Sequence, residues 1–341
     1  MRQMPPEWHP HERTWVAFPH HGYTLGDTEA EQLAARNTWA KVANRASDYE
    51  PVTVLVHPEG VKDAKKHLSS QIEIAEIELD DAWLRDSGPT FVIESGQLAA
   101  VDWVFNGWGA QSWAKYDKDA LVAQKIADLL GVERLASNLV NEGGGIHVDG
   151  SGKVLLTETV QLGKERNPNL SKEEVEAEIH EKLGTQEAIW LKRGLTRDYD
   201  EFGTKGHVDI VACFTPDGRV LYHDQRNERH PDFLVSKEVR QTLEAAGLET
   251  VAVSAPEVQI DGHGFVDYSY INHYVLNDAV LLCGFDDPVD REVAAQVRDV
   301  YPGRKIELID ARELFARGGG IHCITQQQPK VLLTRKACNE A

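Results

Sequence analysis

The feature that most constrains this chain is a phrase that occurs twice. The first copy is "EGGGIHVDGSGKVLLTE" at 142–158, and the second is "GGGIHCITQQQPKVLLT" at 318–334. A phrase repeated so far apart indicates a fold built from equivalent units, each reading as a strand, a turn and a strand. The first turn is "DGSGK", and "TQQQPK" is predicted to be a longer one. Between the aligned glycine segments one residue differs in kind, Val148 against Cys323, which singles out this thiol.

The same order of elements recurs along the chain. Further strand pairs are predicted around turns at 95–96, 216–218 and 277–278. Amphipathic helical patterns follow the strand pairs, and most of them are followed by a short apolar strand. The predicted helices cover 28–48, 117–131, 171–184, 236–248 and 290–303. About five units and no Pro/Gly/Ser linker predict one α/β domain over 1–341, closed as a ring.

Charge and cysteine content exclude several classes of function. The net charge of −19 disfavours nucleic acid and anionic membrane surfaces as partners. The chain has no apolar run long enough to span a membrane and no signal-peptide pattern at its start, so we expect a cytoplasmic protein. Four widely spaced cysteines without a CxxC motif indicate free thiols, and the pair His9 and His11 lacks further spaced ligands, so no metal site is predicted.

Candidate catalytic residues stand where predicted strand pairs begin, in "WLRDSGP", "NEGGG", "GHVD" and "GGGIHC". Equivalent units arranged as a ring would bring these starts to one centre. There Cys323 could act as a nucleophile, with His207 as its acid and base and Glu142 orienting the histidine. The alternative for Cys323 is a buried structural thiol.

Two aspartates make the set distinctive. Asp86 and Asp209 beside one thiol disfavour the thiolate unless a cation lies between them. A guanidinium group fits, because its planar N–H fork pairs with carboxylates in bidentate fashion. In "GHVD" a strand period of two would point His207 and Asp209 to the same face.

The segments "WLRDSGPTFV", "EGGGIHVDG", "NPNLSKEEVE", "GHVDIVACF" and "GGGIHCITQQQP" resemble the signature segments of the agmatine deiminases, a branch of the pentein superfamily. The resemblance spans about residues 4–334. It implies a five-fold pseudosymmetric α/β propeller and a hydrolase that uses neither a metal nor an organic cofactor. It also implies the nucleophile Cys323, the acid/base His207, the orienting acid Glu142 and the guanidinium pair Asp86 and Asp209.

The resemblance further implies that Trp83 lines the aliphatic part of a substrate and that Trp108 stands beside the pocket. Packing beneath the strands is the alternative for both indoles. The implied substrate is the small cation agmatine, hydrolysed to N-carbamoylputrescine and ammonia through a covalent cysteine intermediate. A homodimer is one assembly that such a chain could form.

One segment departs from the family pattern. "DYDEFGTKGHVDI" at 198–210 places Lys205 and Ile210 where many relatives carry other residues, which affects recognition of the far end of the substrate. Other guanidines therefore stay open as substrates: arginine, peptidyl arginine or a longer guanidino-amine. A substrate carboxylate would need a cationic partner, for which Lys205 and Arg85 are candidates. Amidinotransfer and non-catalytic guanidine binding are the remaining alternatives.

Overall fold

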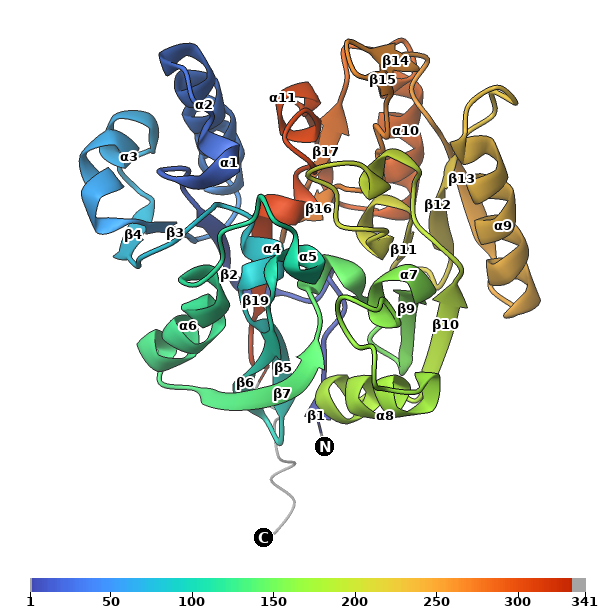
Figure 1. Ribbon diagram of the computed structural model, residues 1–341, viewed down its shortest axis with the longest axis horizontal. Coiled ribbons are helices and arrows are strands. Elements are labelled where there is room, and N and C mark those ends of the chain that lie inside the picture. Colours follow the sequence, from blue (N-terminus) through green and yellow to red (C-terminus); the bar gives the residue numbers. More distant parts are fainter. Residues whose placement is uncertain (1, 333–341) are drawn as a thin grey trace, which may run out of the picture.

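The computed structural model describes residues 2–332, and five small sheets surround its centre (Figure 1). In a typical sheet, the strand Ala212–Phe214 (β11) pairs antiparallel with Val220–Asp224 (β12). The helix Asp232–Ala245 (α9) then crosses to Thr250–Ser254 (β13), which lies parallel to β12. All five sheets share this plan of an antiparallel pair, a helix and a parallel strand. The prediction of a five-fold α/β propeller is confirmed.

The other four sheets have the following strands. One sheet contains β5 (Thr90–Glu94), β6 (Gln97–Val104) and β7 (Glu133–Val140). A second sheet contains β8 (His147–Val148), β9 (Lys153–Thr157) and β10 (Glu187–Leu191). A third sheet contains β16 (Tyr274–Val275), β17 (Ala279–Gly284) and β18 (Lys305–Asp310). The fourth contains β19 (Thr325–Pro329), β2 (His11–Ala17), β3 (Val52–Val56) and β4 (Glu73–Glu76). The strand β1 (Arg2–Gln3) extends the first of these sheets, and β14 (Ile260–Asp261) with β15 (Gly264–Phe265) forms a separate ribbon.

Long helices lie on the outside of the ring, and the short helices α4 and α5 lie near its centre (Figure 1). The crossover helices are α2 (Glu29–Ala46), α6 (Val122–Leu130), α8 (Lys172–Leu183), α9 and α10 (Asp290–Val300). The shorter helices are α1 (Gly22–Leu25), α3 (Val61–His67), α4 (Leu84–Ser87), α5 (Gly107–Ala110), α7 (Glu158–Gln161) and α11 (Arg312–Phe315). Capping boxes begin α2 and α8, where Thr28 and Ser171 accept hydrogen bonds from backbone N–H groups three residues later.

Two local predictions were wrong. The helix expected from 236 begins at Asp232, because Ser236 lies buried inside it and accepts a hydrogen bond from the Gln225 N–H instead of capping a helix end. The segment "TQQQP", expected to be a turn, is the strand β19. Its partner β2 lies more than 300 residues away in the sequence, so no local pattern could reveal the pairing. Lys330, Val331 and Leu332 form no strand, and the end of the expected strand 330–334 lies outside the described residues.

The pairing of β19 with β2 closes the ring. It places Thr325 opposite Val16, and the Trp15 indole N–H donates to the Gln328 side chain at 3.0 Å. The end of the described chain thereby joins its beginning, and the turn before β19 faces the same centre as the turns before the other inner strands. Within residues 2–332, no helix is both long enough and apolar enough to cross a membrane.

Candidate active site

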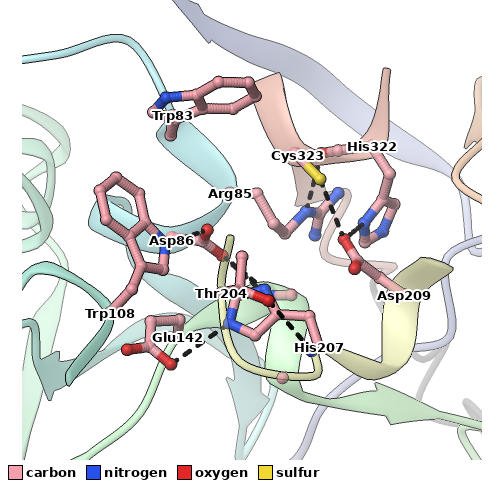
Figure 2. A network of polar contacts seen from close by, with 12 residues as sticks. Trp83, Arg85, Asp86, Trp108, Glu142, Thr204, His207, Asp209, His322 and Cys323 are labelled. Carbon is pink, nitrogen blue, oxygen red and sulfur yellow. Dashed lines mark hydrogen bonds and ion pairs between the residues drawn. The ribbon is translucent and has the colours of Figure 1, made fainter. Parts of the chain in front are cut away.

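Four short turns bring the predicted residues together at the centre of the ring (Figure 2). Asp86 lies in α4, and Glu142 directly precedes a 3₁₀ turn at Gly143–Gly145. Asp209 and Cys323 lie in two further 3₁₀ turns, Val208–Ile210 and His322–Ile324. Each turn precedes the inner strand of a different sheet. The prediction that "GHVD" is a strand was wrong, because Val208–Ile210 is a 3₁₀ turn preceded by His207. This turn, and not a strand period of two, places His207 and Asp209 at the centre.

Gly144 shows how closely these groups approach one another. A Cβ atom on this residue would lie 2.5 Å from His207 Nδ1 and 3.0 Å from both Asp209 Oδ2 and Asp86 Oδ1. The Gly144 N–H also donates to Asp86 Oδ1 at 3.0 Å. A glycine is required here because any side chain would occupy the space between the imidazole and the two carboxylates.

His207 is held from one side by a buried ion pair. Its Nε2 lies 3.3 Å from Glu142 Oε2, and Arg166 Nε donates to both oxygens of Glu142 at 2.9 and 3.0 Å. Burial opposes a charged imidazole, but Asp86, Glu142 and Asp209 outweigh it and raise the pKa of His207 to about 9. Although burial favours the neutral acid, Arg166 and His207 lower the pKa of Glu142. His207 is therefore an imidazolium at neutral pH and can donate a proton.

The two aspartates are ordered by different partners. The Trp108 indole N–H donates to Asp86 Oδ2 at 2.8 Å, and His322 Nδ1 lies 2.8 Å from Asp209 Oδ2. Burial raises the pKa of Asp86, with Asp209 and Glu142 adding to the effect. Burial also acts on Asp209, but His322 outweighs it and lowers the pKa. Among the described residues, Asp209 Oδ1 has no hydrogen-bond partner, which is rare for a buried carboxylate.

Cys323 is 4% exposed, and its sulfur lies 3.5 Å from Asp209 Oδ2. The Asn272 amide donates to the sulfur at 3.3 Å. Burial raises the pKa of Cys323 well above its ordinary value, and the carboxylates of Asp209 and Asp86 raise it further. The resting thiol is therefore protonated, and a cation bound between the carboxylates would favour its ionisation.

The tryptophans occupy different positions. The Trp83 ring lies beside Cys323, and a Cβ atom on Gly319 would be 2.9 Å from both the sulfur and this indole. Trp108 instead orders Asp86 through its N–H group. Both indoles are almost fully buried, so they contribute to the core as well as to the walls of the site.

Sequence reasoning missed three groups at this centre. Asn272 lies two residues before β16, so its place at the start of a predicted strand pair is the signal that marks it. His322 forms a chain of contacts, with Asp209 on one side and Glu7 Oε1 at 2.6 Å on the other. Its counterpart in the first phrase, His147, lies 3.8 Å from the same Glu7 oxygen. Nothing in "PPEWHP" indicates that Glu7 is buried between two histidines.

Aromatic side chains from three separate segments stack on one another next to the site. Tyr23 in α1 stacks on Phe202 with ring centres 3.6 Å apart, and Trp113 meets Phe202 at 5.1 Å. Trp113 also stacks on Trp108 at 5.4 Å, which connects this group to Asp86. Phe202 has a φ of 70°, an unfavourable conformation for a bulky residue, so its neighbours hold the backbone there. We call Tyr23, Phe202 and Trp113 the aromatic cover.

The described geometry agrees with a known family. Residues 3–329 match the Porphyromonas-type peptidyl-arginine deiminases. The chain belongs to this family. A Streptomyces coelicolor protein provisionally called an agmatine deiminase is 56% identical over 337 residues, covering 96% of this chain and 99% of its own. The agmatine deiminase of Ectopseudomonas mendocina is 36% identical over 362 residues, covering 96% and 95%.

Solved structures show the same fold. The agmatine deiminase of Enterococcus faecalis superposes with a TM-score of 0.89 at 32% identity, covering 97% of this chain and 96% of its own. A C. jejuni agmatine deiminase gives the same TM-score at 23% identity, covering 98% of both chains. The family and its pentein fold are those that the glycine motifs indicated.

Proposed function

We propose that this protein hydrolyses agmatine to N-carbamoylputrescine and ammonia. The observation that carries the proposal is the buried pair Asp86 and Asp209, which flanks the thiol of Cys323 and leaves Asp209 Oδ1 without a partner among the described residues. A guanidinium group would donate to this oxygen and offset part of the negative charge of the two carboxylates. The agmatine deiminases among the relatives support the same reaction.

The proposed chemistry begins when the guanidinium binds. Its positive charge offsets part of the charge of Asp86 and Asp209, so the Cys323 thiol can lose its proton to solvent and the sulfur can attack the guanidinium carbon. His207, with its pKa raised to about 9, protonates the departing nitrogen, which leaves as ammonia. The carbon–sulfur bond now joins the remaining amidine to Cys323. His207, now neutral and oriented by Glu142, takes one proton from water as the water oxygen attacks the amidine carbon. The carbon–sulfur bond then breaks and the second proton of that water passes to the sulfur, which gives the ureido product and the thiol.

A pocket of about 240 Å³ next to the catalytic loop suits the distal ammonium of agmatine. Its lining includes Gly318 and the acidic residues Asp198, Asp200, Glu201 and Asp267. Arg197 also lines it, but its guanidinium is paired with Asp261 at 2.7 Å. An amine gains from this acidic lining, whereas the carboxylate of arginine would be repelled.

Lys205 and Arg85, the candidates to bind a substrate carboxylate, are both engaged by groups of the protein. Lys205 Nζ donates to the carbonyls of Tyr199 and Asp200 at 2.8 and 3.0 Å. The Arg85 guanidinium is buried against the His322 carbonyl and the Gln326 side chain. The aromatic cover further favours a small substrate over a peptidyl arginine, which would carry a protein chain past it. The homodimer and the cytoplasmic location stay predictions.

A panel of guanidines tests the proposal, with ammonia and the ureido product both measured. We expect kcat/KM for agmatine to exceed that for arginine at least about 100-fold, or about 2.7 kcal/mol. Cys323→Ser should remove turnover while leaving the fold intact, since an alcohol is a poor nucleophile here. Values within tenfold of each other, or a preference for arginine, would reject agmatine and leave deimination standing. Ammonia release by the serine variant would reject the mechanism itself.

A further inference from the structure

A cluster of metal-binding side chains lies apart from the catalytic residues, at the ends of two neighbouring strands. His20 and His21 follow β2, and His57 with Glu59 follows β3. These strands are parallel, so their carboxyl ends lie at the same edge of one sheet, beside α1 and α3 (Figure 1). One ligand atom from each of the four residues lies within 4.8 Å of all the others.

The rings are packed as a compact group. His20 stacks on His57 with centres 5.2 Å apart, and His21 meets His57 at 4.7 Å and His20 at 4.3 Å. The carboxylate of Glu59 lies 3.9 Å from His20 Nε2. Three imidazoles and one carboxylate are the ligand set that zinc prefers, and modest side-chain rotations would bring these atoms to bonding distance.

Two further observations point to a ligand at this cluster. His20 Nδ1 is buried and has no hydrogen-bond partner among residues 2–332. Gly60 leaves the space that this ring occupies, because a Cβ atom there would lie 2.9 Å from the same nitrogen. The histidines are thus packed with a nitrogen atom unsatisfied, which ordinary packing disfavours.

Lys118 is the group that a metal would have to replace. Its Nζ lies 3.4 Å from His57 Nε2 and 3.2 Å from Glu78 Oε1. The Lys118 side chain is part-exposed, so it can turn toward Glu78 and leave the His57 nitrogen to the cation. Among the ligands, His57 is buried and His20 is partly buried, whereas His21 and Glu59 are exposed and free to turn toward an ion.

We propose that His20, His21, His57 and Glu59 form a site for one zinc ion, separate from the catalytic centre. The site joins the segment before α1 to the end of β3. Because α1 carries Tyr23, which stacks on Phe202, the bound ion fixes one wall of the aromatic cover. The sequence shows no zinc motif here, since the ligands come from two strands and not from one loop.

Zinc binding is tested on the full chain, first stripped with a chelator, by competition with a chromogenic chelator. We expect one equivalent of Zn²⁺ to bind, and His57→Ala to weaken the affinity at least about 100-fold, since even groups behind metal ligands contribute about 10- to 100-fold. His21→Ala, at an exposed position, gives the same test if the buried variant fails to fold. His67→Ala is the matched control, because this histidine of α3 lies outside the cluster and contacts Asn37.

A cobalt spectrum and hydrogen exchange test which residues bind the ion. Co²⁺ in place of zinc should give a visible spectrum of nitrogen and oxygen ligands without a thiolate band, which separates the site from Cys323. Zinc should also slow hydrogen exchange in residues 20–25 of the parent protein and not in His57→Ala. An unchanged affinity in both histidine variants, no stoichiometric binding, or a thiolate band in the cobalt spectrum would overturn the proposal.

Discussion

Asp209 links the thiol to a neighbouring histidine. Its Oδ2 atom meets His322 Nδ1 at 2.8 Å and the sulfur of Cys323 at 3.5 Å, while Oδ1 has no partner in the described chain. One carboxylate therefore acts on the resting thiol and also has an oxygen free to accept a hydrogen bond. In the proposed mechanism, a cationic substrate offsets the charge that hinders ionisation of the thiol, so we expect activation of the nucleophile to be coupled to binding.

Asp209→Asn tests this coupling. The amide keeps the shape but removes the charge, so we expect kcat/KM for the guanidine to fall by several powers of ten. The pKa of Cys323 should fall, because the Asp209 charge that raises it is gone. The alkylation rate of this thiol against pH, without substrate, measures the change. A variant that retained more than about a tenth of parental efficiency would refute the paired-carboxylate role.

We predict that Glu7 positions the site through His322, whose Nε2 lies 2.6 Å from Glu7 Oε1. Burial and Arg85 oppose a charged His322, but Glu7 and Asp209 outweigh them and raise its pKa. In Glu7→Gln the raising contribution of the carboxylate is lost, so His322 should lose its proton at lower pH, and the alkaline limb of the kcat profile should move down. We expect kcat to fall about 10- to 100-fold, because hydrogen bonds to charged groups contribute about 1.5–3 kcal/mol.

The pH profile of kcat shows whether Glu7 positions His322 or only supports the fold. Glu94→Gln is the control, because this exposed glutamate pairs with Arg2 away from the centre. A lower kcat with an unmoved alkaline limb would show that Glu7 only supports the fold.

At the scale of elements, the aromatic cover lies next to the site. The predicted catalytic residues are almost fully buried, so we expect α1 or the segment around Phe202 to move when a substrate enters. Each of these segments is short, and they meet mainly through stacked rings. Such contacts are weaker than the strand pairing of the ring, which makes them the part able to open.

Phe202→Ala should loosen this cover. We expect Cys323 to react about 2- to 10-fold faster with a small alkylating agent, since a stacked aromatic pair contributes about 0.5–1.5 kcal/mol. Labelling followed by mass spectrometry measures the rate, and the buried thiols of Cys213 and Cys283 serve as internal references. Phe233→Ala, on the helix α9, should leave the rate unchanged. An unchanged rate in Phe202→Ala would place the entrance elsewhere.

At the scale of the whole molecule, buried titratable groups set the pH dependence of stability. Burial lowers the pKa of His223 and of His273 to about 4, so the stability that these two side chains contribute rises with pH between 4 and 6.5. Burial also raises the pKa of Asp81 to about 6 and of Asp267 to about 7, and the contribution of these acids falls with pH over the same range. The pKa of His207 is raised to about 9, so from 6.5 to 9 the folded protein holds the extra proton and stability should fall.

Urea unfolding at a series of pH values measures this dependence. The free energy of unfolding should fall by on the order of 3 kcal/mol between pH 6.5 and 9, as the raised pKa of His207 requires. His207→Gln should flatten the alkaline side alone. A free energy that kept rising to pH 9 would contradict the raised pKa of His207.

The sequence by itself determined the repeating unit and most of its chemistry. Equivalent units, each with a strand pair, a helix and a parallel strand, follow from hydrophobic periodicity and turn residues, which act over neighbouring positions. The contrast of Val148 with Cys323 marked the thiol at the centre of the ring, and the motifs marked His207, Glu142 and Asp209 beside it. These features depend on neighbouring residues, so they can be predicted from the sequence.

Only the tertiary structure decided what the ring closure brings together. Glu7 reaches His322 across 315 residues, and β19 joins β2 at the opposite end of the chain. The shape of "GHVD" was also set there, because the crowded centre holds it as a turn and not as a strand. Contacts between distant segments form through packing and charge pairing in space, and no residue spacing along the chain encodes them.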